Sequence, residues 1–222
     1  MNRTAKRFRT SGSLLGMLTH QLGEQEARRR LWHFFPGMIA LALATAPHRE
    51  TVRLWVMVLI VTGGILIPAW AAIRYQRAYQ RRVGENPIPS ILGYVLPVSI
   101  LCLLYRSHIE IPLTVTAIIA FGDGSATLMG LLNGKNKVPW NPRKSWAGLC
   151  AFLVVGTLMA SMVYWISAQG TMTFPQTLAC VLPVVAICGV LETLPLSIND
   201  NITIGCSAGI LLVLFQRMTL GW

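Results

Sequence analysis

The chain alternates between long apolar runs and short polar stretches. Residues 54–73, 87–105 and 146–191 contain no charged side chain. A helix needs about 20 apolar residues to cross roughly 30 Å of hydrocarbon, so each of the first two runs predicts one membrane helix. The third run is long enough for two helices, and the turn-prone stretch at residues 167–175 predicts a hairpin between them.

Three weaker runs complete the pattern, at residues 31–46, 111–132 and 202–216. The first and third are short for a span, and the second is interrupted by a Gly-Asp-Gly sequence centred on Asp123. Together the runs predict an all-α, polytopic integral membrane protein with about seven transmembrane helices.

The basic residues predict the orientation of these helices. Of the 19 Lys and Arg residues, seven precede residue 33, four lie at residues 74–82 and four at residues 135–144. Because basic loops tend to stay on the cytoplasmic side, the N-terminus is predicted to be cytoplasmic. The loops at residues 123–144 and 192–201 then face the cytoplasm, and the C-terminus lies outside.

Composition supports the membrane interpretation. Of 222 residues, 54% are hydrophobic and only 12% are charged, about half the charged share of a soluble domain. We therefore expect a basic cytoplasmic tail at residues 1–30 and a single transmembrane helical catalytic domain at residues 31–222. The Arg-rich start would also suit an organelle transit peptide, but the cytoplasmic tail is preferred.

The net charge of +11 does not indicate nucleic-acid binding. The basic residues lie between apolar runs and are not interleaved with aromatic residues on one surface. They are explained by topology, and the expected partners are membrane lipids and small molecules. The oligomeric state cannot be inferred from this pattern.

Three acidic residues stand out because an ionisable group at membrane depth is costly and usually functional. Asp123, Glu192 and Asp200 come from separate segments, and the predicted topology brings them to one membrane face. Carboxylate ligands suit Mg²⁺, so these three residues are candidate catalytic and metal-binding groups. The alternative for the last two is a helix end and a helix cap.

A glycine-rich and basic segment surrounds and follows Asp123. Glycines allow backbone N–H groups to approach a ligand, basic side chains attract anions, and a helix N-terminus near Ser145 favours phosphate. A rival explanation is that the glycines serve helix packing and the basic residues serve topology or lipid headgroups. The candidate phosphate-binding residues are Gly122, Gly124, Gly130, Gly134, Lys137, Lys144, Ser145 and Asn201.

Arginines also stand where the first apolar run begins. Arg29 and Arg30 could clamp a phosphate as bidentate donors, or they could snorkel to the interface while Trp32 marks the membrane boundary. On the pattern alone the second explanation is preferred, and His33 is a helix-start residue.

These residues make the chain similar to the CTP-dependent lipid-alcohol kinases, which include phytol kinase, dolichol kinase and the CTP-using diacylglycerol kinases and are related to phosphatidate cytidylyltransferases. The resemblance extends from about Arg29 to Phe215. It is carried by three ordered motifs: Arg29-Arg30-x-x-His33-x-x-x-Gly37; Gly122-Asp123-Gly124-x-Ala126-x-x-x-Gly130-x-x-x-Gly134 with Lys137-x-Pro139-x-Asn141-x-x-Lys144-Ser145-x-x-Gly148; and Glu192-x-x-Pro195 with Asp200-Asn201. The chain departs from the family at Thr127, Leu131, Leu132 and Asn199.

The resemblance implies that the γ-phosphate of a nucleoside triphosphate, with CTP as the expected donor and Mg²⁺ as the expected cofactor, is transferred to a lipid alcohol. The acceptor would be an isoprenoid alcohol of the phytol or polyprenol type, or diacylglycerol. A cytidylyltransferase that forms a CDP-lipid is the first alternative, and a transporter is a second. The expected location is a bacterial inner membrane, with the site facing the cytoplasm.

Overall fold

The computed structural model describes residues 30–47, 50–74 and 88–220. In these ranges the chain forms helices at all seven predicted apolar runs, and one short β-hairpin. The elements are α3 (Phe35–Ala44), α4 (Glu50–Arg74), α6 (Ile88–Leu104), α7 (Glu110–Ala117), the π-helix η1 (Ile118–Asp123), α8 (Gly124–Asn133), β1 (Lys137–Val138), β2 (Asn141–Ser145), α9 (Trp146–Ser167), α10 (Phe174–Thr193) and α11 (Asp200–Leu220).

Four helical stretches in this part of the chain are long and apolar enough to cross a membrane: Glu110–Asn133, Trp146–Ser167, Phe174–Thr193 and Asp200–Thr219. Arg30–Ala44 and Leu92–Leu104 are apolar but shorter. The helical architecture, with apolar helices long enough to cross a membrane, is therefore confirmed. The count of seven spans, the cytoplasmic N-terminus and the domain boundary near residue 30 stay predictions, and residues 1–29 lie outside the described ranges.

The helix that contains Asp123 does not end there, contrary to the predicted loop at residues 123–144. Helices α7, η1 and α8 form one continuous stretch from Glu110 to Asn133. At η1 the helix widens to a π-helical turn, a feature found frequently at functional sites. Asp123 is thus the last residue of a π-turn inside a long helix, and the polar connection begins about three turns later, at Gly134.

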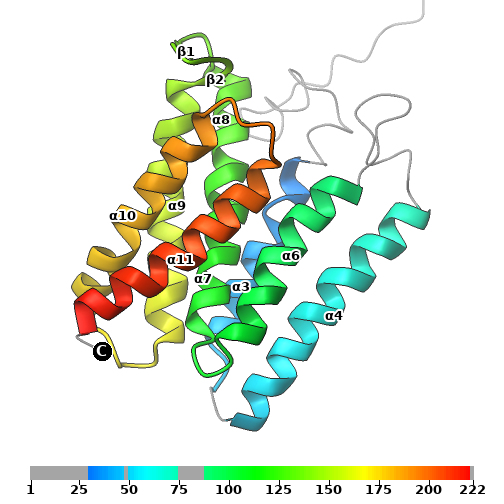
Figure 1. Cartoon of the computed structure of the whole chain (residues 1–222), viewed down its shortest axis with the longest axis vertical. Helices are drawn as coiled ribbons and strands as arrows, with labels where there is room; N and C mark the ends of the chain where they lie inside the picture. The colour runs from blue at the N-terminus through cyan, green and yellow to red at the C-terminus, as the bar shows by residue number, and fades with distance from the viewer. Residues whose placement is uncertain (1–29, 48–49, 75–87, 221–222) are drawn as a thin grey trace, which may run out of the picture.

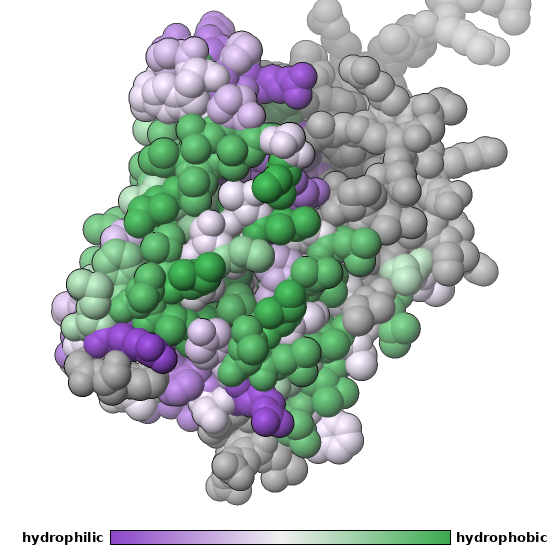
Figure 2. Space-filling view, viewed as in Figure 1, coloured by the Kyte–Doolittle hydropathy of each residue, from purple (hydrophilic) through white to green (hydrophobic). Residues whose placement is uncertain are grey.

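The helices pack side by side into one bundle, with the β-hairpin at one end (Figure 1). Helix α9 packs against α7, η1, α8 and α10, while α11 packs against α10, α6 and α7. Helix α4 lies outermost and packs on α6. On the face drawn in Figure 2, apolar side chains cover the flank and polar ones gather toward the two ends. This distribution suits an apolar belt in the bilayer.

The hairpin stands at one end of the bundle, between α8 and α9 (Figure 1). Its strands pair antiparallel, with Lys137 opposite Ser145 and Val138 opposite Asn141. Ser145 then caps α9, because its Oγ accepts a hydrogen bond from the Gly148 N–H at 3.2 Å. The predicted helix start at Ser145 is confirmed.

The opposite end is held by a different polar group, centred on Glu110 at the start of α7. Its Oε1 lies 2.9 Å from His108 Nδ1 and accepts a hydrogen bond from Gln216 Nε2 of α11 at 3.3 Å. The fully buried Tyr164 of α9 experiences the charge of Glu110, and its hydroxyl has no hydrogen-bond partner among the described residues.

A close approach at Gly37 fixes α3 against the π-turn. A Cβ atom at this position would lie 2.5 Å from Phe121 Cε2 and 2.8 Å from Ala120 Cβ. Both neighbours are buried in the centre of the bundle, so they cannot move aside without cost. The glycine therefore sets how near the start of α3 comes to Asp123.

We expect Gly37→Ala to lower the stability of the protein by about 1–3 kcal/mol, because overpacking a filled core has a cost of this size. The thermal unfolding midpoint in detergent should fall. Gly64→Ala is the matched control, since its Cβ would meet Val95 at an ordinary 3.4 Å. An unchanged midpoint for Gly37→Ala would contradict the tight α3 contact.

Candidate active site

Asp123 is enclosed by groups from α3 and the residues just before it. Its side chain is 14% exposed, and its Oδ2 lies 3.2 Å from Nε2 of His33. The two groups are at ion-pair distance, although the ring N–H is not aligned for a hydrogen bond. The charge of Arg30 also acts on Asp123. A carboxylate near the bilayer thus has cationic neighbours that offset part of its desolvation.

Lys144 joins the two remaining acidic residues. Its Nζ contacts the Glu192 carboxylate closely and donates a hydrogen bond to Asp200 Oδ2 at 2.8 Å. The Glu192 side chain is only 4% exposed, so it needs a cationic partner. Burial lowers the pKa of Lys144, but Glu192 and Asp200 outweigh burial and raise it above its usual value. Lys144 is therefore charged throughout the neutral range.

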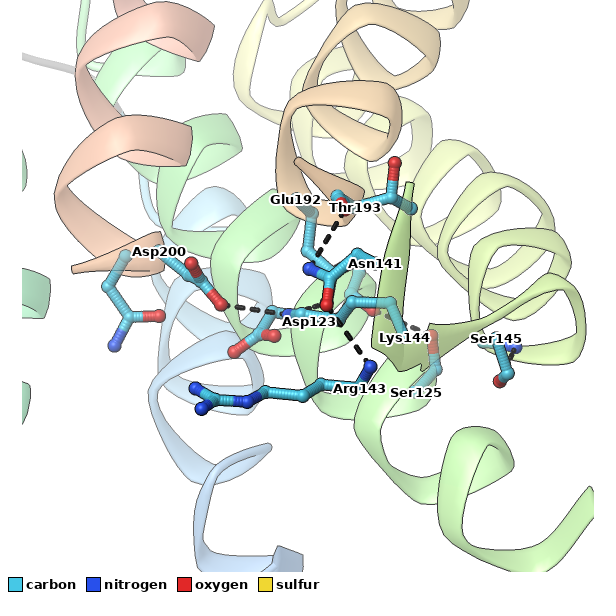
Figure 3. Close-up of polar contacts among 12 residues, drawn as sticks. Asp123, Ser125, Asn141, Arg143, Lys144, Ser145, Glu192, Thr193 and Asp200 are labelled. Atoms are coloured by element: carbon cyan, nitrogen blue, oxygen red, sulfur yellow. Dashed lines mark hydrogen bonds and ion pairs between the residues drawn. The ribbon is translucent and has the colours of Figure 1, made fainter. Parts of the chain in front are cut away.

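Figure 3 shows these side chains converging from separate elements: Asp123 from η1, Lys144 from β2, Glu192 from α10 and Asp200 from α11. The charge of Lys144 also acts on Asp123, and that of Asp123 on Glu192. The predicted gathering of three acidic residues at one end of the bundle is therefore present in the fold.

The hairpin is attached to the end of α10. Asn141 is buried, and its Nδ2 donates a hydrogen bond to the Thr193 carbonyl at 3.1 Å. Trp140 Nε1 donates to Thr193 Oγ1 at 3.0 Å. Both contacts span more than 50 residues of sequence and place β2, with Lys144, beside Glu192. The Asn141 side chain therefore bonds to the backbone at the end of α10 and holds the hairpin there.

Packing explains most of the candidate phosphate-binding glycines. A Cβ at Gly122 would meet the Phe152 ring at 3.0 Å, and one at Gly124 would meet His33 and Phe34 at 3.1 Å. At Gly134 a Cβ would lie 1.9 Å from the Gly130 carbonyl oxygen. Helix packing and helix termination are thus sufficient to explain a glycine at these three positions.

The other predicted binding residues differ in their exposure and in their contacts. Lys137 is exposed on β1 and makes no ion pair with any residue that the structure describes. Gly130 lies beside Ser145 Oγ, since a Cβ there would be 3.4 Å from it. Asn201 donates its backbone N–H to Asn199 Oδ1 at 2.9 Å, so Asn199 caps the last helix, which begins at Asp200. Arg29 lies outside the described ranges.

The acidic residues do not form a ready-made three-carboxylate metal site. In the described ranges, no group of three or more His, Cys, Asp and Glu side chains is arranged to hold one metal ion. Lys144 occupies the position between Glu192 and Asp200. Mg²⁺ usually takes only one or two protein carboxylates together with substrate phosphates, so the residues fit an ion that arrives with a nucleotide.

Two residues of this region, His33 and Arg143, are absent from the candidate site residues named from the sequence, although His33 belongs to the first family motif. His33 had been assigned to the helix start, yet it contacts Asp123 across 90 residues of chain. The available signal was its position four residues before Gly37, which places both on one helical face. Arg143 is one of the four basic residues at residues 135–144, and no local pattern separates it from Lys135.

We expect Lys144→Met to destabilise the protein by about 2 kcal/mol, because it leaves the buried Glu192 carboxylate unpaired. The value is below the 3–5 kcal/mol of a fully buried pair, since Lys144 is 24% exposed and Asp200 is 41% exposed. Adding Glu192→Gln should recover most of the loss in a thermal unfolding experiment. A single variant as stable as the wild type would show that the pair contributes nothing.

Comparison with known proteins bears on the chemistry of this site. The chain is 33% identical to phytol kinase 1 of Arabidopsis thaliana over 125 residues. The aligned segment covers 54% of this chain and 41% of that protein. It is 32% identical over 123 residues to farnesol kinase of the same plant, with 54% and 40% covered. A probable phytol kinase 1 of Oryza sativa subsp. japonica is 24% identical over 202 residues, with 85% and 64% covered.

No family model and no solved structure matches the chain. The chain spans about two fifths of the length of the first two relatives. All three relatives are named as chloroplastic, so the prediction of a bacterial inner membrane is not borne out. The chain is nonetheless homologous to plant phytol and farnesol kinases, and its resemblance to the CTP-dependent lipid-alcohol kinases is confirmed.

Proposed function

We propose that this protein is a membrane-embedded kinase that transfers the γ-phosphate of a nucleoside triphosphate, with CTP as the donor, to an isoprenoid alcohol. One observation carries the proposal: Asp123, Lys144, Glu192 and Asp200 come together at one end of an apolar bundle. Relatives named as kinases of phytol and farnesol supply the acceptor class.

The position of the site suits two substrates of opposite polarity. The nucleotide reaches the polar end of the bundle from water, where the hairpin and its basic residues lie. The lipid alcohol stays in the bilayer with its hydroxyl at the same depth as Asp123. Phosphoryl transfer requires mainly positioning and charge stabilisation, and groups at helix ends can provide both.

In the proposed reaction, the alcohol oxygen attacks the γ-phosphorus, and the bond from that phosphorus to the β-phosphate oxygen breaks. The products are a lipid monophosphate and a nucleoside diphosphate, and the hydroxyl proton passes to a carboxylate of the site. Basic residues at this end offset the negative charge of the phosphates. Lys137, Arg29 and Arg30 are the residues proposed for this role, while Lys144 stays paired with Glu192 and Asp200.

Mg²⁺ bound with the nucleotide would neutralise charge on the β- and γ-phosphates. Asp123 is the proposed protein ligand, with Glu192 or Asp200 as a second. The cationic neighbours of Asp123 keep its carboxylate in place before the nucleotide binds. Glu192 and Asp200 are already held by Lys144.

Membranes that contain the protein should transfer label from γ-labelled CTP to phytol, farnesol or a polyprenol, with ATP tested in parallel. Label from the cytidine ring should stay in water-soluble products. Cytidine label in the lipid fraction would support a cytidylyltransferase instead. Uptake of a solute into vesicles without nucleotide would support a transporter.

Asp123→Asn should reduce product formation at least 100-fold, because the amide lacks the charge needed to hold a divalent ion and interact with His33. The variant should remain in the membrane fraction at the wild-type level, since the amide keeps the shape of the carboxylate. Glu24→Gln, which changes one carboxylate in the basic N-terminal segment, is the charge-matched control. Full activity in Asp123→Asn would exclude Asp123 from the reaction.

A further inference from the structure

We infer that Arg143 is a binding residue for the phosphate chain of the nucleotide, and that it provides the free positive charge which Lys144 cannot. The inference deepens the proposed function, because it assigns a specific residue to the nucleotide that the kinase would use. It depends on three features of the hairpin: charge balance, exposure and the direction of one side chain.

The charge of Lys144 is already balanced within the protein. Its ammonium group contacts two carboxylates, Glu192 and Asp200. An incoming phosphate would have to compete with both, and release of Lys144 would leave the buried Glu192 without a partner. The cation nearest the acidic cluster is thus the least available one for a new anion.

Arg143 is in the opposite situation, although it is the adjacent residue. Its side chain is exposed, and no ion pair connects it to any residue in the described ranges. Residues 124–191 contain no Asp or Glu, so the hairpin offers no acidic neighbour in sequence either. An exposed guanidinium without a carboxylate partner keeps its full attraction for an anion.

The backbone at Arg143 is nevertheless fixed. Its N–H donates a hydrogen bond to Asn141 Oδ1 at 3.1 Å, and Asn141 is itself bonded to the Thr193 carbonyl. Figure 3 shows the Arg143 side chain extending toward the part of the site where Asp123 and Asp200 lie. A rigid base with a free guanidinium limits the ordering cost of binding.

The overall charge of the site makes such a cation necessary. Three carboxylates face Lys144, Arg30 and the ring of His33, so the cluster has no surplus positive charge to offer a ligand. A triphosphate adds several negative charges, and a divalent ion offsets only part of them. Arginine is suited to the remainder, because its planar fork binds two phosphate oxygens at once.

The test uses the full chain in lipid nanodiscs and measures equilibrium binding of labelled CTP and ATP with excess Mg²⁺. Arg143→Gln should weaken nucleotide binding about tenfold, as expected for loss of a charge-assisted contact. Arg143→Lys should recover part of the affinity. Lys135→Gln, which removes one exposed charge near the same hairpin, should change affinity less than twofold.

Activity assays add a second readout. In Arg143→Gln the KM for nucleotide should rise about tenfold, while the KM for the isoprenoid alcohol stays within twofold. Unchanged nucleotide affinity in Arg143→Gln, or an equal loss in Lys135→Gln, would overturn the assignment. Wild-type protein that binds nucleotide but transfers no phosphate would refute the kinase function and leave the binding role of Arg143 intact.

Anionic lipid headgroups are the competing source of phosphate, and the lipid composition separates the two. The binding measurements are made in nanodiscs of phosphatidylcholine alone and with phosphatidylglycerol added. The same tenfold effect in both is expected. An effect confined to the discs with phosphatidylglycerol would assign Arg143 to lipid and overturn its role toward the nucleotide. Absence of any nucleotide binding by the wild type would overturn it as well.

Discussion

The buried carboxylate of Glu192 is the constraint on which this end of the molecule depends. A carboxylate with 4% of its side chain exposed cannot remain charged beside a bilayer unless a cation accompanies it. Lys144 meets that requirement, but only if β2 lies against the end of α10. The hydrogen bonds from Trp140 and Asn141 to Thr193 hold it there. The hairpin is therefore part of the site.

Asp123 depends on a different kind of constraint, which is the course of the helix. The π-turn at Ile118–Asp123 lies where α3, α9 and α11 pack around the long central helix. Gly37 allows α3 to approach this turn closely, and the approach brings His33 to Asp123. One carboxylate is thus positioned by helix packing and the others by a salt bridge, so substitutions at the two sets should have separable effects.

Much of this arrangement could be predicted from the sequence. Apolar runs located each helix that the structure describes, the polar break at residues 167–175 predicted the α9–α10 hairpin, and rare acidic residues pointed to the candidate site. The π-turn could not be predicted, because an apolar run of one and the same composition can form either an α-helical or a π-helical turn. The β-hairpin was hidden by Pro139 and Pro142, which weaken any strand pattern. The contacts of Lys144 with Glu192 and Asp200 join distant segments, so no local spacing indicates them.

The attachment of the hairpin to Thr193 has a mechanical consequence. Helix α10 has 20 residues, which as a helix span about 30 Å, the thickness of a hydrocarbon core. It ends at Thr193, the residue to which the hairpin is hydrogen-bonded. A thicker or thinner bilayer changes the tilt of a helix of this length. Because the hairpin is bonded to the helix end, that tilt would shift Lys144 and Arg143 relative to Asp123 on the central helix. Membrane thickness thereby becomes a physical variable of the candidate site, coupled to it through the two hydrogen bonds at Thr193.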